Sequence, residues 1–107
     1  MIDLASKRIT VTGGAGFLGT HVVAKLQALG CTEIFVPRHP EYDLLQSPDV
    51  ARMYDDARPE IVIHLAAKVG GIGYNSELPA EFLYENAMMG MLVIEGAHRC
   101  EIGRAHV

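Results

Sequence analysis

The chain has 107 residues, of which 50% are hydrophobic, and a formal net charge of −4. This length allows one small domain, and the acidic balance argues against a nucleic-acid partner, which requires a basic surface. No apolar stretch reaches the length of a membrane span, and charged residues within positions 1–12 argue against a signal peptide. Two cysteines without CxxC or metal-ligand spacing indicate reduced thiols in a cytoplasmic protein without a metal site.

Strand and helix patterns alternate from the N-terminus onward. The apolar run over residues 7–12 predicts a first strand buried on both faces of a parallel sheet. A helix is expected from about residue 16 to residue 29, and Gly30 is a natural stop. Its apolar residues recur at helical spacing and predict a buried stripe of Leu18, Val22, Leu26 and Leu29. Residues 33–36 follow as a second strand.

The same alternation continues through the second half of the chain. Ser47 as N-cap and Pro48 at the first helical position predict a helix that ends at Arg58-Pro59. Residues 60–66 read as a buried strand, a glycine-rich loop covers 68–78, and a long helix runs from Pro79 to about Arg99. This order predicts an α/β fold, the N-terminal half of a Rossmann-like doubly wound parallel sheet.

A glycine-rich turn between the first strand and the first helix is the strongest functional motif. Its spacing, Gly13, Gly16 and Gly19, is typical of dinucleotide binding in this strand–turn–helix context. The three glycines permit a tight turn, a close approach of the pyrophosphate and close helix packing, respectively. The alternative is a glycine-rich turn that only packs. The predicted cofactor-binding residues here are Gly13, Gly14, Ala15, Gly16, Phe17, Leu18 and Gly19.

The end of the second strand bears on which dinucleotide binds. An acidic residue there normally holds the ribose hydroxyls of NAD. This chain instead has Arg38 and His39, with no carboxylate before Glu41. A cation suits the 2′-phosphate of NADP, so we expect NADPH rather than NAD as cofactor. The alternative is that Arg38 is a solvated surface arginine.

Two motifs together indicate a family. The glycine turn, with His64-Leu65-Ala66-Ala67 at the end of a later strand, resembles the extended short-chain dehydrogenase/reductases. Within them, the runs from Ala66 to Asn75 and from Pro79 to Asn86 resemble the GDP-L-fucose synthase family. The resemblance implies an NADPH-dependent 3,5-epimerase-4-reductase that converts GDP-4-keto-6-deoxy-D-mannose to GDP-L-fucose, and a GDP-sugar as its substrate.

The resemblance also assigns roles around the cofactor. It implies that Asp43 and Leu44 lie near the adenine, although Asp43 is equally well explained as a loop-capping residue. It implies that Leu65, Ala66 and Ala67 flank the cofactor ribose, which ordinary packing at a strand end would also explain.

Three further positions carry weaker expectations. Lys68 is expected to contact cofactor or substrate, with a solvated lysine as the alternative. Asn86 would order the helix and water near a catalytic lysine, with an exposed helix asparagine as the alternative. His64 reads as a core or strand-end histidine rather than a catalytic one. The methionines of the last helix suit either core packing or the homodimer face that the resemblance implies for the full-length protein.

The catalytic pair implied by the resemblance, Tyr-x-x-x-Lys, does not occur in the chain. Each tyrosine is followed four residues later by a different residue: Gln46, Arg58, Leu78 or Met88. We therefore assign no catalytic residue and expect residues 1–100 to be a partial NAD(P)-binding Rossmann domain that is inactive by itself. Alternatives are a fragment of another NAD(P)-dependent nucleotide-sugar epimerase or dehydratase, and a stand-alone NADP-binding module without catalysis.

The last residues do not continue the family pattern. Ile102 to Val107 is the peptide that ATC-GGA-AGA-GCA-CAC-GTC encodes, the core of a common sequencing adapter. We expect 101–107 to be a non-native, adapter-derived tail that is disordered or arbitrarily helical. The alternative is a natural terminus.

Overall fold

The computed structural model describes residues 3–67, 79–100 and 104–106. The elements in chain order are η1 (Leu4–Ser6), β1 (Ile9–Thr12), α1 (Phe17–Ala28), β2 (Ile34–Phe35), α2 (Ser47–Ala57), β3 (Ile61–His64), α4 (Pro79–Arg99) and β4 (Arg104–His106). The strands form one sheet in the order β2-β1-β3-β4, and every pairing is parallel. Ile9 of β1 lies in register with Ile34 of β2 and with Ile61 of β3.

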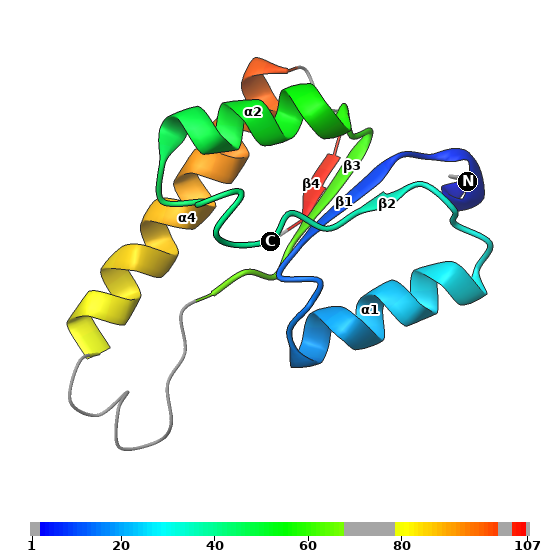
Figure 1. Cartoon of the computed structure of the whole chain (residues 1–107), viewed down its shortest axis with the longest axis horizontal. Coiled ribbons are helices and arrows are strands. Elements are labelled where there is room, and N and C mark those ends of the chain that lie inside the picture. The colour runs from blue at the N-terminus through cyan, green and yellow to red at the C-terminus, as the bar shows by residue number, and fades with distance from the viewer. Residues whose placement is uncertain (1–2, 68–78, 101–103, 107) are drawn as a thin grey trace.

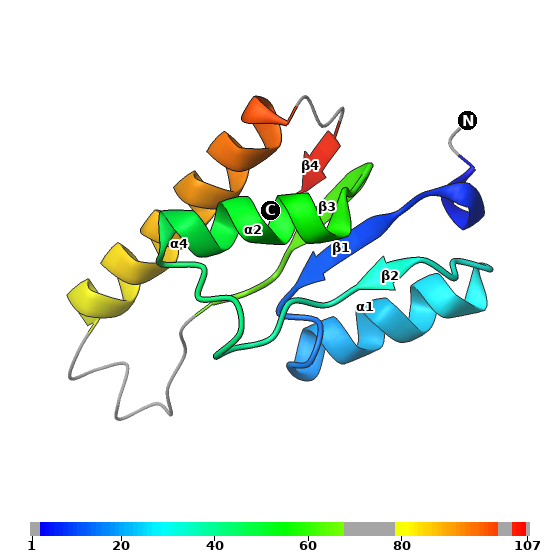
Figure 2. The ribbon, with the colours of Figure 1, turned by 45° about the horizontal axis from the view of Figure 1, so that its top comes forward.

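Helices cover both faces of the sheet. α1 lies on one face, and α2 and α4 lie together on the other (Figures 1 and 2). The side chains of β1 alternate accordingly: Ile9 and Val11 pack into a cluster with Leu26 of α1. Val62 of β3 belongs to the opposite cluster, with Val93 of α4. The predicted Rossmann-like α/β architecture is therefore confirmed.

The predicted buried stripe along α1 is confirmed for only two of its four residues. Leu26 is buried and Val22 is half-buried, but Leu18 and Leu29 are 59% and 54% exposed. Among the described residues α1 is the one helix on its face of the sheet, so only the line that touches the strands is covered. Gly30 follows the helix with a φ of +94°, as expected of the stop residue.

The N-cap of helix α2 lies one residue earlier than the sequence predicts. Gln46, not Ser47, is the N-cap, because it has extended backbone angles and its carbonyl accepts the Val50 N–H at 3.1 Å. Pro48 still lies in the first turn, where its missing N–H costs nothing. The long helix over Pro79–Arg99 is confirmed.

The expectation of a disordered or arbitrarily helical tail was wrong for residues 104–106, whereas 101–103 and 107 lie outside the described residues. Arg104–His106 is neither disordered nor helical but forms β4, parallel to β3, with Arg104 in register with Ile61. The physical reason is that the free edge of β3 presents unpaired N–H and C=O groups, which an adjacent extended segment satisfies. The adapter origin of residues 101–107 stays a prediction about the DNA.

Neither cysteine is in a disulfide; Cys31 is buried and Cys100 is exposed. Within the described ranges, no helix is long and apolar enough to cross a membrane.

Candidate cofactor-binding site

A cavity of about 430 Å³ lies where the loops after β1, β2 and β3 meet. This is the carboxyl edge of the sheet. The chain passes from β1 to β2 on one side of β1 and then to β3 on its other side, so the topological switch point lies at this edge. Many predicted cofactor-binding residues line this cavity: Gly13, Ala15, Gly16, Arg38, Asp43, Leu44, Ala66 and Ala67. The structure thus brings together predicted residues from three separate segments.

The glycines of the turn differ in what requires them. Gly13 has a φ of +73°, and a Cβ on it would lie 2.7 Å from the backbone nitrogen of Ala66. A Cβ on Gly19 would lie 1.9 Å from the carbonyl oxygen of Gly13. At Gly16 a Cβ would meet only that same oxygen, at an ordinary 3.4 Å. The chain's own packing therefore requires Gly13 and Gly19, whereas Gly16 leaves open space beside the cavity.

The start of α1, which follows the cavity-lining Gly16, has backbone hydrogen-bond donors without helical partners. Gly16 is the N-cap and has no side-chain capping bond, and the Thr20 N–H donates to its carbonyl at 2.8 Å. The N–H groups of Phe17 and Leu18 precede that first helical bond and so have no partner within the helix. Free N–H groups at a positive helix end form an anion-binding site.

The ends of β1 and β3 are joined by Thr12 and His64, which are both buried. The Thr12 hydroxyl accepts the N–H groups of Leu65 at 3.1 Å and Ala66 at 3.2 Å. Its own proton is then free to donate to Nδ1 of His64, 2.6 Å away. This assigns a neutral imidazole with its proton on Nε2. Burial lowers the pKa of His64, which favours the same neutral form.

His64 is thus a buried strand-end residue, as predicted. The contribution of Thr12 was missed, although a threonine within an apolar strand was the available signal. The Thr12 hydroxyl thus holds the backbone that leads into Ala66 and Ala67 against the end of β1. Both alanines line the cavity.

Of the two interpretations of Asp43, the structure shows the loop-capping one, and a place near an adenine stays a prediction. Its Oδ1 accepts the Leu45 N–H at 3.0 Å, so it caps the loop, and it also lines the cavity. Arg38 is exposed at the cavity wall.

Other predicted residues lie outside the cavity lining. Gly14 is buried against Val36, and Gly19 and Leu65 lie behind the turn. The side chains of Phe17 and Leu18 are 86% and 59% exposed. Asn86 is half-buried on α4, and Lys68 lies outside the described residues. Lining residues that were not predicted are Pro37, His39, Tyr42, Leu45 and Met89; the first four neighbour predicted ones in sequence, and only folding brings Met89 to the site.

No group of three His, Cys, Asp or Glu side chains in the described part of the chain could hold a metal ion.

Residues 9–107 match the model of the NAD dependent epimerase/dehydratase family. The chain belongs to this family. Curated members include GDP-L-fucose synthase from Sinorhizobium fredii, which is 38% identical over 99 residues, and GDP-L-fucose synthase 1 from Arabidopsis thaliana, 39% identical over 93 residues. The alignments cover 92% and 87% of this chain but only 31% and 29% of those relatives. The chain therefore spans less than a third of their length.

Solved structures of other proteins superpose well on the chain. A GDP-D-glycero-L-gluco-heptose synthase from Campylobacter jejuni, crystallised in the presence of NADPH, matches with a TM-score of 0.86 and 28% identity. That match covers 94% of this chain and 29% of the synthase. A UDP-glucose 4-epimerase from Thermus thermophilus in complex with NAD matches with a TM-score of 0.75 and 29% identity, over 89% of this chain and 35% of the epimerase.

Proposed function

We propose that this chain is the cofactor-binding part of an NADPH-dependent, GDP-L-fucose synthase-like enzyme, which converts GDP-4-keto-6-deoxy-D-mannose to GDP-L-fucose in the cytoplasm. The observation that carries the proposal is the cavity at the carboxyl ends of three parallel strands, lined by the glycine turn and by Ala66 and Ala67. The similarity to GDP-L-fucose synthases from bacteria and plants supports the substrate class.

In the proposed binding mode, the pyrophosphate lies beside Gly16 and accepts hydrogen bonds from the N–H groups at the start of α1. Asp43 and Leu44 receive the adenine, and Ala66 and Ala67 flank the ribose. Arg38, at the cavity wall, pairs with the 2′-phosphate. Leu65 also flanks the ribose, Lys68 contacts cofactor or substrate, and Asn86 orders the helix and water near the catalytic lysine of the full-length enzyme.

Gly16 provides the sharpest test of the phosphate site. A Cβ there meets ordinary packing distances within the chain but would occupy the space of the pyrophosphate. Gly16→Ala should therefore keep the circular dichroism spectrum and weaken NADPH binding by about tenfold or more. Gly90→Ala is the matched control, because a Cβ at Gly90 meets nothing within 4 Å and Gly90 does not line the cavity. Equal NADPH affinity of the Gly16 variant and the unchanged chain would refute the site.

Arg38 supports NADPH over NADH, because only NADPH carries a 2′-phosphate for the guanidinium to pair with. Titration of the chain with each nucleotide, followed by nucleotide fluorescence, should give a dissociation constant for NADPH about tenfold lower than for NADH. Equal affinities would refute the assignment and favour an epimerase of the kind that crystallised with NAD.

Reduction of a 4-keto sugar requires a hydride donor and a positioned proton donor. The Tyr-x-x-x-Lys pair that the resemblance implies for the second role is not in the sequence. We therefore expect no turnover from this chain with NADPH and a GDP-4-keto sugar. A stand-alone NADP-binding module without catalysis is the second candidate, and it shares the nucleotide site tested above.

Helix α4 supports the proposed homodimer of the full-length enzyme. Leu83, Tyr84, Met91 and Ile94 are 50–71% exposed, and helical geometry places all four on one side of the helix. The expectation that this helix also packs in the core is met by Met89, which is 6% exposed. One face of α4 thus contacts the sheet, and the opposite face is available to a second copy.

A further inference from the structure

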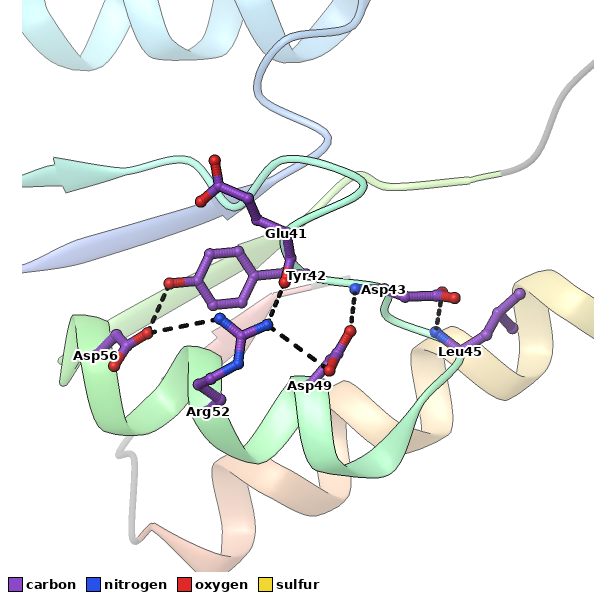
Figure 3. Close-up of polar contacts among 7 residues, drawn as sticks. All are labelled: Glu41, Tyr42, Asp43, Leu45, Asp49, Arg52 and Asp56. Atoms are coloured by element: carbon purple, nitrogen blue, oxygen red, sulfur yellow. Dashed lines mark hydrogen bonds and ion pairs between the residues drawn. The ribbon is translucent and has the colours of Figure 1, made fainter.

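The loop of residues 38–46 forms one wall of the cavity but contains no regular strand or helix. Hydrogen bonds and ion pairs of a group of polar residues connect it to α2 (Figure 3). At its centre is Arg52, whose guanidinium donates to the carbonyl oxygen of Glu41. The guanidinium carbon also lies 4.3 Å from the centroid of the Tyr42 ring, within the range of a cation–π contact.

Tyr42 is held on its other sides as well. Its hydroxyl donates to Oδ2 of Asp56 at 2.6 Å, and its ring meets Phe35 edge-to-face with centroids 5.6 Å apart. Its N–H donates to the carbonyl of Arg38 at 3.0 Å. The contacts therefore form a chain from Arg52 through Tyr42 to the backbone of Arg38.

The neighbouring part of the loop has a separate attachment. The N–H of Asp43 donates to Oδ2 of Asp49 at 2.8 Å, and the Asp43 side chain caps Leu45. Arg52 also approaches Asp49 at 3.6 Å and Asp56, four residues on, at 4.0 Å; all three side chains are partly exposed to solvent, where such pairs are weak. The Arg38 side and the Asp43 side of the wall are thus held by different groups.

We propose that Arg52 is a positioning residue for cofactor selection: by holding Tyr42 against α2, it keeps Arg38 at the cavity wall and so favours a 2′-phosphorylated dinucleotide. This inference rests on the proposed NADPH-binding function. Arg52 itself does not line the cavity and acts through its contacts with Tyr42 and with the carbonyl oxygen of Glu41. Loss of Arg52 leaves the Arg38 turn held only by the Asp56 and Phe35 contacts of Tyr42, whereas the Asp43 side and the glycine turn keep all of their own contacts.

The test is nucleotide selectivity in Arg52→Met, with Arg99→Met as the matched control. Arg99 is also an arginine in an i,i+4 pair on a helix, 2.7 Å from Glu95, and it does not line the cavity. Dissociation constants for NADPH and NADH are measured with the melting temperature. Arg52→Met should weaken NADPH binding about tenfold and NADH binding about threefold or less, whereas Arg99→Met should leave both unchanged. Arg52→Lys should fall between, because an ammonium can face the ring but lacks the fork of donors.

An unchanged ratio of the two dissociation constants in Arg52→Met would overturn the inference, as would an equal change in Arg99→Met. A purely structural role for Arg52 lowers the melting temperature and weakens both nucleotides alike, which also overturns it. If Arg52→Met does not fold, Arg52→Lys decides: it keeps the charge but lacks the fork of donors and should still narrow the ratio of the two dissociation constants. If the unchanged chain binds neither nucleotide, the proposed function itself fails; if it prefers NADPH and the variants keep that preference, only the role of Arg52 fails.

Discussion

Two threonines of β1 lie on the same face of the sheet and are predicted to respond in opposite directions to the same substitution. Thr10 and Thr12 are 1% and 0% exposed. The Thr12 hydroxyl contacts the N–H groups of Leu65 and Ala66 and the imidazole of His64. The Thr10 hydroxyl is buried without a hydrogen-bond partner among the described residues. Valine keeps the shape of threonine and removes only the hydroxyl, so Thr10→Val and Thr12→Val isolate the value of each group.

The magnitudes follow from the partners that each change leaves behind. In Thr12→Val, Leu65 keeps its bond to the Thr12 carbonyl, at 3.0 Å. The N–H of Ala66 and Nδ1 of His64 lose theirs. At about 1–3 kcal/mol for each buried group left unsatisfied, and with Ala66 only half-buried, the free energy of unfolding should fall by about 2–4 kcal/mol. Thr10→Val instead removes an unpaired buried hydroxyl, which should raise it by about 1 kcal/mol.

The assay is thermal and urea unfolding of the chain and both variants, followed by circular dichroism. For a chain of this size, a change of 1 kcal/mol moves the melting temperature by roughly 4–8 °C. Thr10→Val should therefore melt several degrees higher and Thr12→Val at least about 8 °C lower, with unchanged urea m-values. A Thr10 variant that loses as much stability as the Thr12 variant would refute the reasoning, because burial alone would then govern both sites.

Other predictions concern helix packing, pH and the tail. Gly90→Ala should stabilise α4 by about 1 kcal/mol, measured by urea unfolding. Gly96→Ala should destabilise it, because its Cβ would lie 2.6 Å from the Tyr54 ring; stabilisation by both would contradict the packing. Since burial lowers the pKa of His64, the unfolded chain protonates first as pH falls below about 6.5. Stability should therefore decline there, and a urea midpoint that is constant from pH 7.5 to 5.5 would exclude this. Burial also raises the pKa of Tyr54 to about 12, so the unfolded state ionises first and stability should fall as pH rises above about 10. The source DNA of 102–107 should carry the adapter codons given above, and other codons would refute the adapter origin.

Much of the cavity lining was predictable because the sequence motifs that contribute to it are local. The turn from Gly13 to Gly19 needs only the strand before it and the helix after it, so its spacing is readable in sequence. Arg38 was predictable from its place after a strand. The hydrogen bonds of Thr12 and the position of Met89 were not, because their partners are distant in sequence and meet only after the strands pair. The cation–π contact between Arg52 and Tyr42 was missed for the same reason.

Two predictions were wrong, and each has a physical reason: the burial of Leu18 and Leu29 on α1, and the structure of residues 104–106. Helical spacing shows which residues share a face but not how wide the covered stripe is, so Leu18 and Leu29 were assigned to a core that does not reach them. The tail was judged by its departure from a family pattern, whereas its backbone pairs by main-chain hydrogen bonding, which hardly depends on side chains.

The sequence by itself determined the order of strands and helices as far as α4, the parallel α/β class and the glycine turn, because hydrophobic period and glycine spacing act over a few neighbouring residues. The tertiary structure alone decided which of the glycines the chain's own packing requires, which threonine hydroxyl is satisfied and which side chains hold the loop after β2. Those properties depend on distances between segments as far apart as Thr12 and His64. Such distances exist only once the burial of both sheet faces has fixed the register of the strands.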